Sequence, residues 1–237
     1  MAQWAGLRHA FAQSNCDDQG PRRGVVNWGP YLLCAAAVAG LLRAERRGSR
    51  TGLWLTKPVA SLAFIWAALA MGALETTYGQ LVLLGLVLCL LGDLLLIPLG
   101  RPAIFKAGVF AFLAGHLAYS AAFLTRPLDP LGLAVAAALL AGVLLGVLRW
   151  LASSLPPDMV GPVRTYMLVI GVMSALACGV SAAGGPWAVA VGALAFTASD
   201  ISVARDRFVR HEFVNRAWGL PLYYAAQLLI ATTPALI

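Results

Sequence analysis

Charged residues are scarce in this sequence. Its 237 residues include only 17 basic and 10 acidic side chains, whereas a soluble domain of this length carries roughly 60 charges. So few charges cannot cover a water-soluble globule, which excludes a soluble enzyme and a nucleic-acid-binding module. Intrinsic disorder is excluded as well, because it requires low hydrophobicity and 60% of the residues are hydrophobic. The composition predicts a polytopic membrane protein, and its formal charge of +7 then bears on topology and lipid headgroups.

Histidine and cysteine are also too few for common catalytic centres. Of the three histidines only His116 lies in an apolar segment, so a multi-histidine zinc site cannot assemble, and neither a metal nor a cofactor is predicted. The four cysteines lack the paired spacing of a disulfide scaffold or zinc ribbon. We therefore expect Cys34, Cys89 and Cys178 to be free thiols inside the membrane. A G-x-S-x-G nucleophile motif is absent from the sequence.

Long apolar runs account for most of the chain. A membrane helix needs about 20 apolar residues, and the pattern predicts an all-α bundle of about eight transmembrane helices. Residues 1–24 form a polar tail without the apolar region of a signal peptide, and residues 25–237 form a single transmembrane domain. The expected spans are Val25–Leu42, Pro58–Leu74, Leu81–Leu99, Ile104–Leu124, Leu131–Leu148, Val163–Ala182, Trp187–Ala204 and Leu220–Ile237.

Basic residues are distributed unevenly between the two sets of loops. The loops after the odd-numbered spans, together with the first residues of the spans that follow them, contain 13 lysines and arginines, against 4 in the N-terminal tail and the remaining loops. Because basic loops stay in the cytosol, we expect the odd loops there and both termini on the other side.

Two aspartates lie within apolar spans. Asp93 and Asp200 precede the ends of two parallel spans by about 9 and 6 Å at the helical rise per residue, so they share one half of the bilayer. An ionisable group at such a position is costly, and it usually faces the bundle interior or a wet cavity. Other polar residues in or at the edges of the spans complete a candidate site: Lys57, His116, Tyr119, Tyr166, Tyr223, Tyr224 and Gln227.

Paired carboxylates in a low-dielectric pocket divide acid and base roles between them. They suit a substrate that is protonated to an oxocarbenium-like cation and then attacked by water. A proton-coupled lipid or solute transporter that uses the same aspartates as a relay is the alternative. An intramembrane aspartyl protease is disfavoured because Leu90-Leu91-Gly92-Asp93 lacks the first glycine of a Gly-x-Gly-Asp motif. A non-catalytic scaffold is disfavoured by the clustered charges.

An ordered set of short motifs identifies a family resemblance. The motifs are Lys57-Pro58, Gly92-Asp93, His116-Leu117-Ala118-Tyr119, Tyr166 after Pro157-Asp158-Met159-Val160, Ser199-Asp200 and Tyr223-Tyr224-Ala225-Ala226-Gln227. In this order the sequence resembles the transmembrane protein 86 family, the YhhN-like lysoplasmalogenases. The resemblance implies hydrolysis of the vinyl ether bond of lysoplasmalogens to a fatty aldehyde and glycerophosphocholine or glycerophosphoethanolamine.

Residue roles follow as a hypothesis from this resemblance. Asp93 and Asp200 form the catalytic pair, and which of them is the acid stays open. Substrate binding is assigned to two groups: Lys57, Tyr223, Tyr224 and Gln227 toward the headgroup or glycerol oxygens, and His116, Tyr119 and Tyr166 along the pocket.

The expected partners are a lysophospholipid, water and membrane lipids, without nucleic acid. The sequence does not decide whether the protein forms a homodimer. The resemblance implies an endoplasmic reticulum or related membrane for a eukaryotic source, and a bacterial membrane otherwise.

Overall fold

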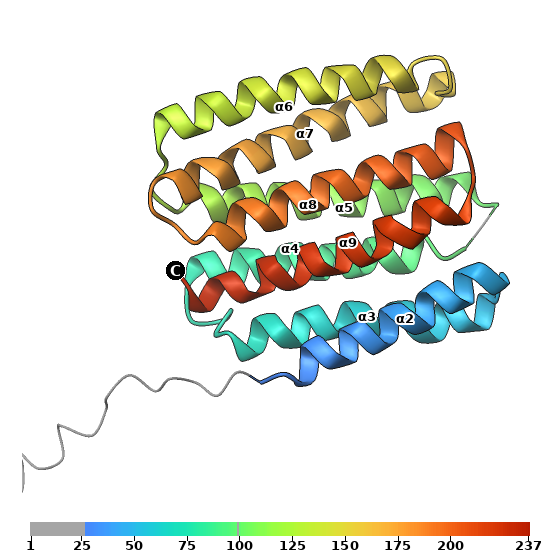
Figure 1. The fold of residues 1–237 in the computed structure, drawn as a ribbon, viewed down its shortest axis with the longest axis horizontal. Coiled ribbons are helices and arrows are strands. Elements are labelled where there is room, and N and C mark those ends of the chain that lie inside the picture. Colours follow the sequence, from blue (N-terminus) through green and yellow to red (C-terminus); the bar gives the residue numbers. More distant parts are fainter. Residues whose placement is uncertain (1–26, 99) are drawn as a thin grey trace, which may run out of the picture.

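The computed structural model describes residues 27–98 and 100–237, and within them the chain is a bundle of long helices (Figure 1). The polar tail 1–24 lies outside the described residues. A π-turn, η1 (Arg205–Val209), continues α8, and a 3₁₀ turn, η2 (Thr233–Ala235), follows α9. The α-helices are α2 (Gly29–Arg47), α3 (Arg50–Ala70), α4 (Thr77–Leu95), α5 (Pro102–Leu124), α6 (Pro130–Leu151), α7 (Pro157–Ala182), α8 (Trp187–Ala204) and α9 (Phe213–Thr232).

Capping residues and prolines set many of the helix starts. Ser49, Thr76 and Asp129 accept hydrogen bonds from backbone amides in the first turns of α3, α4 and α6, which satisfies donors that lack a helical partner. Prolines open α5, α6 and α7, where a missing N–H has no cost. Gly48 ends α2 with a φ of 63°, a left-handed conformation that favours glycine.

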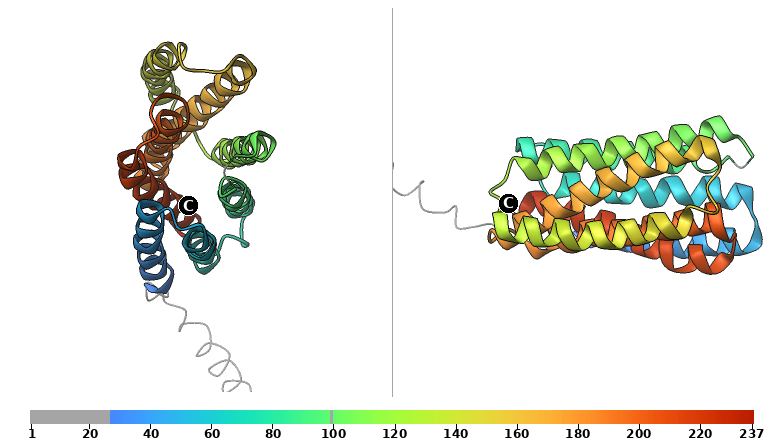
Figure 2. Two further views of the ribbon diagram at one scale, coloured as in Figure 1. Left: turned by 90° about the vertical axis from the view of Figure 1, so that its right-hand side faces the viewer. Right: turned by 90° about the horizontal axis from the view of Figure 1, so that it is seen from above.

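Consecutive helices pack as antiparallel pairs, and α9 joins the pairs together. The main partners are α2 with α3, α4 with α5, α6 with α7, and α8 with α9, while α9 also packs on α2, α3 and α4. Viewed along the bundle, α6 lies at one edge and α2 at the opposite edge (Figure 2). Only Ala136, Leu144 and Leu151 of α6 are buried, so this helix presents most of its apolar surface to lipid.

Six of the eight described helices, α3 to α8, are long and apolar enough to cross a membrane, which confirms the all-α, polytopic membrane class. The two others differ for local reasons. The last turns of α2 carry Arg43, Glu45, Arg46 and Arg47. The central helix α9 is 20 residues long, enough to cross the hydrocarbon core at 1.5 Å per residue, but it contains polar residues that lower its hydropathy.

Two expected span boundaries were wrong in a way that matters for the site. Lys57 and Pro58 do not open a span, because α3 begins at Arg50 and includes both. Tyr223 and Tyr224 likewise lie in the middle of α9, which begins at Phe213. An apolar run ends at a charged residue or a proline, but the helix itself can continue through both. Neighbouring helices make proline tolerable inside a membrane helix.

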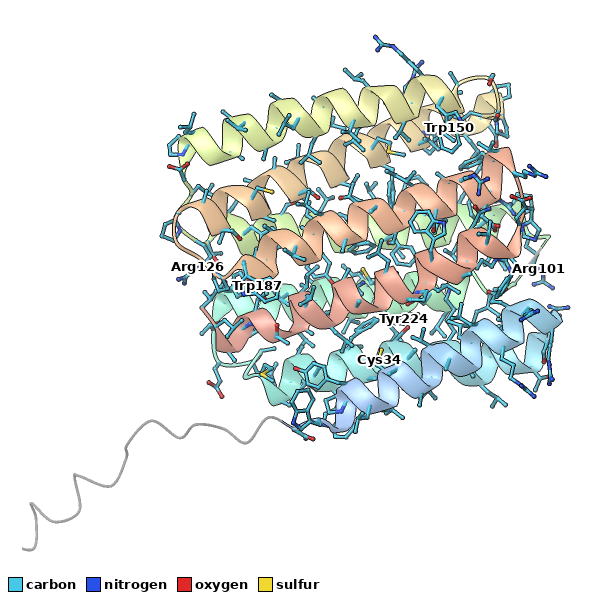
Figure 3. The ribbon with its side chains drawn as sticks, in the orientation of Figure 1. Cys34, Arg101, Arg126, Trp150, Trp187 and Tyr224 are labelled. Atoms are coloured by element: carbon cyan, nitrogen blue, oxygen red, sulfur yellow. The ribbon has the colours of Figure 1, made fainter. Side chains whose placement is uncertain are left out.

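Side chains near the two ends of the bundle fit a membrane orientation. Arg101 and Arg126 lie at opposite ends, and so do the largely exposed Trp150 and Trp187 (Figure 3). Tryptophan is typical of both membrane interfaces. Cys34 and Cys89 are buried, and Cys178 is partly buried; all three are free thiols, as the sequence predicts.

Candidate active site

Side chains from two helices, α3 and α9, hold the carboxylate of Asp93. Lys57 Nζ on α3 lies 3.2 Å from Asp93 Oδ1. Ser61 Oγ and Tyr223 Oη each donate a hydrogen bond to Oδ2, at 2.7 and 2.8 Å. Asp93 itself is near the end of α4, and only 3% of its side chain is exposed. The cation and the two hydroxyl donors each stabilise this buried carboxylate as an anion.

The local sequence explains how these groups converge. Lys57 and Ser61 are four residues apart, so they project from the same face of α3. Gly92, beside Asp93, lets α4 approach α5 closely, since a Cβ at this position would lie 2.6 Å from Phe112 Cδ2. The small residue thus lets the Phe112 ring of α5 pack against α4 at the position next to Asp93.

Asp200 occupies a second, less compensated polar site formed by α5, α7 and α8. Tyr166 Oη donates a hydrogen bond to Asp200 Oδ2 at 2.7 Å. His116 Nε2 lies 3.6 Å from the same oxygen, which is beyond normal hydrogen-bond length. The side chain of Asp200 is 15% exposed, and the described residues place no lysine or arginine in an ion pair with it.

The contact of Nδ1 shows which nitrogen of the His116 ring carries the hydrogen. Nδ1 lies 2.6 Å from the backbone carbonyl oxygen of Phe112, and a carbonyl only accepts, so Nδ1 carries the hydrogen. Nε2 is buried, and no group in the described residues forms a hydrogen bond with it. In the neutral ring Nε2 therefore keeps a lone pair that can accept a proton or a hydrogen bond beside Asp200.

Both carboxylates line one cavity of about 530 Å³. Lys57, Tyr166 and Tyr223 line it as well, and it extends to the helix ends at Arg101 and Arg207. This volume lies within the usual range for small-molecule sites. Much of the wall is apolar, with Leu95, Leu96, Phe105, Val109, Phe112, Met159, Val163 and Met167.

Four of the predicted site residues lie behind the cavity wall instead of lining it. Tyr119 Oη donates a hydrogen bond to Gln227 Oε1 at 2.8 Å, and both residues are fully buried. Tyr224 Oη is 3.4 Å from Ser61 Oγ, in the interior of the bundle (Figure 3). His116 packs on the Phe196 ring, with 4.5 Å between ring centroids. These residues support the groups that line the cavity.

The structure adds polar residues that the sequence analysis did not single out. Ser61 is one, and its spacing of four residues from Lys57 was the available signal. The others form a network at the mouth of the cavity, in which Arg216 bonds Glu45 of α2 and Asp206 of η1. His211 also pairs with Asp206 at 3.1 Å. Glu45 is distant in sequence from the other three, and the four residues do not belong to one helix, so spacing along a helix could not reveal them.

Within the part of the chain that the structure describes, no three histidine, cysteine, aspartate or glutamate side chains form a group that could hold a metal ion. The site defined by the geometry is instead a pair of carboxylates with tyrosine, serine, lysine and histidine neighbours, inside a polytopic helical membrane protein.

Comparison with known proteins identifies the family. Residues 52–233 match the YhhN family, and the chain belongs to it. The chain is 35% identical to the human lysoplasmalogenase TMEM86B over 95% of its length and 93% of the relative. It is also 35% identical to mouse TMEM86B, covering 90% of this chain and 88% of the relative. Bovine lysoplasmalogenase TMEM86A is 34% identical over 63% of each chain. No solved structure matches.

Proposed function

We propose that this protein is a lysoplasmalogenase, which hydrolyses the vinyl ether bond of lysoplasmalogens to a fatty aldehyde and a glycerophosphocholine or glycerophosphoethanolamine. One observation carries the proposal: two buried carboxylates with unequal partners line the same cavity. The names of the human, mouse and bovine relatives support the same activity.

The contacts suggest different roles for the two carboxylates. Asp93 has a lysine and two hydroxyl donors, so it is suited to remain ionised and to stabilise positive charge in the cavity. Asp200 has one hydroxyl donor and a more distant histidine, so it is suited to carry a proton. Unequal environments of this kind separate acid and base functions at one pH.

The proposed reaction begins with proton transfer from Asp200 to the double-bond carbon that is not attached to the ether oxygen. The resulting oxocarbenium ion is stabilised by the Asp93 carboxylate. Water adds to the cationic carbon and gives its proton to a carboxylate, with the ionised Asp200 as the nearest base beside His116. The hemiacetal then loses its hydroxyl proton, the glycerol oxygen takes a proton, and the carbon–oxygen bond breaks to release aldehyde and alcohol.

The cavity shape fits a single-chain lipid. Phe105, Val109 and Phe112 follow one face of α5 and continue the apolar wall toward the carboxylates. We place the vinyl ether bond beside the two carboxylates and the glycerol oxygens near Lys57 and Tyr223. The mouth lies at the end of the bundle that the basic residues assign to the cytosol.

Aldehyde release by the purified protein in detergent tests the proposal. The wild-type protein should release aldehyde from lysoplasmenylethanolamine, and Asp93→Asn and Asp200→Asn should each lose about 100-fold or more of this rate, the usual contribution of acid–base catalysis. Asp158→Asn is the matched control, because Asp158 is an exposed carboxylate paired with Lys106 outside the cavity. Wild-type rates in folded Asp93 and Asp200 variants would refute the mechanism.

Isotope labelling tests the protonation step directly. In deuterium oxide, with the aldehyde reduced as it forms, the product should carry one deuterium on the carbon next to the carbonyl carbon. A product without this deuterium contradicts protonation at carbon. A transporter would release no aldehyde in detergent and would show flux only in vesicles.

A further inference from the structure

The cations that line the cavity fall into two groups. Lys57 pairs with Asp93, Arg216 pairs with Glu45 and Asp206, and His211 pairs with Asp206. Each of these three basic side chains therefore has an acidic partner on the same cavity wall.

Arg101 and Arg207 form the second group. Both line the cavity, and both are exposed at its mouth. Neither has an acidic partner among residues 27–98 and 100–237. The acids closest in sequence to Arg207 are occupied, since Asp206 accepts hydrogen bonds from Arg216 and Asn215. Within the described part of the chain, the mouth therefore carries positive charge that no acidic side chain neutralises.

The ring of Phe105 holds Arg207 at the mouth of the cavity. The guanidinium carbon of Arg207 lies 4.1 Å from the centroid of the Phe105 ring, a cation–π contact that orients its donors. Arg101 is the N-cap residue of α5 and precedes Phe105 by about one helical turn. Phe208 packs against the other side of this arrangement, with its ring centroid 6.4 Å from that of Phe105.

The distance to the carboxylates suits a glycerol-sized spacer. Arg207 follows Asp200 by seven residues along α8 and η1, which corresponds to about 10 Å or less at the helical rise. The flexible arginine side chain covers part of this separation. An anion held at the mouth thus lies one short linker away from the reacting groups.

Building on the proposed function, we propose that Arg101 and Arg207 bind the phosphodiester of the lysophospholipid headgroup and make the protein select phosphate-containing substrates. A planar guanidinium matches two phosphate oxygens at once. Lys57 is committed to Asp93, so the headgroup phosphate is recognised at the mouth and the vinyl ether bond reaches the carboxylates below it.

The test compares two vinyl ether substrates, lysoplasmenylethanolamine and the phosphate-free 1-alkenylglycerol, in the same detergent. For the double variant Arg101→Gln/Arg207→Gln, the ratio of kcat/KM for the phosphate-containing substrate to that for the phosphate-free one should fall about 10-fold or more, the usual effect of a charge-assisted hydrogen bond. The fall in this ratio should come from a higher KM for the phosphate-containing substrate. Arg207→Lys, which keeps the charge, should recover part of the ratio. Arg149→Gln, an exposed arginine on α6 outside the cavity, should keep the wild-type ratio.

Each outcome separates this inference from the proposed function. An unchanged ratio in the double variant overturns the phosphate site while aldehyde release by the wild-type protein still supports the lysoplasmalogenase. Equal losses on both substrates overturn it too, because they indicate a structural role or binding of another membrane lipid. A site for free phosphate would make inorganic phosphate change turnover of the phosphate-free substrate, which also contradicts the proposal. A wild-type protein that releases no aldehyde refutes the proposed function itself.

Discussion

Replacing Lys57 by methionine removes the only cation that pairs with Asp93 in the described structure. The two charges lie 3.2 Å apart, a separation at which their attraction is about 5 kcal/mol for an effective dielectric constant of 20. Loss of one partner leaves the other charge buried, with a typical cost of about 3 to 5 kcal/mol. For a chain of this size such a loss lowers the melting temperature by roughly 6 to 20 °C. Activity should fall as well, because Asp93 would take up a proton and no longer stabilise a cation.

Thermal unfolding in detergent together with aldehyde release measures both effects. Lys57→Met/Asp93→Asn should recover much of the melting temperature but not the activity, because the second change removes the unpaired charge and the catalytic carboxylate together. Lys106→Met is the matched control. Its pair with Asp158 is shorter, at 2.7 Å, but both side chains are exposed, and exposed pairs contribute little to stability. Equal stability and activity of Lys57→Met and the wild-type protein would refute the assigned role of the ion pair.

Two further substitutions test the support of the site. Tyr166→Phe removes the one hydroxyl that bonds the second carboxylate and should lower kcat about 10-fold or more, whereas Tyr31→Phe on α2, outside the cavity, should not; equal kcat values would contradict the assignment. Gly85→Ala should lower the melting temperature and cost about 1 to 3 kcal/mol, because the new Cβ would lie 2.4 Å from Tyr119 Cε1. Gly142→Ala, with no neighbour within 4 Å, should unfold like the wild-type protein, and a similar loss in both alanine variants would exclude this packing explanation.

The helices were largely predictable because membrane insertion depends on local sequence. An apolar run must span the hydrocarbon core whatever its tertiary partners are, and the turns at Gly100-Arg101-Pro102 and Gly184-Gly185-Pro186 fall between helices as expected. Boundaries inside charged regions were not predictable in the same way. Residues 50–57 are helical because α3 packs on α2 and α9. The length of an apolar run does not reveal such a tertiary contact.

The depth of a residue along its helix was predictable, but its partners were not. Counting residues from the helix ends placed Asp93 and Asp200 in the same half of the membrane, and both line one cavity. The division of the polar residues between the two carboxylates depends on helix rotation and on which helices are neighbours. For this reason Lys57 and Tyr223 could not be assigned to Asp93, or Tyr166 to Asp200, before the fold was known.

The two carboxylates have separate direct partners. The contacts of Asp93 come from α3 and α9, and those of Asp200 come from α5 and α7. A substitution among the partners of one carboxylate therefore leaves the direct partners of the other in place. The helices themselves are coupled by packing, since α4 packs on α5 and α8 packs on α9. A change in the spacing between the carboxylates would consequently strain the bonds that hold each of them.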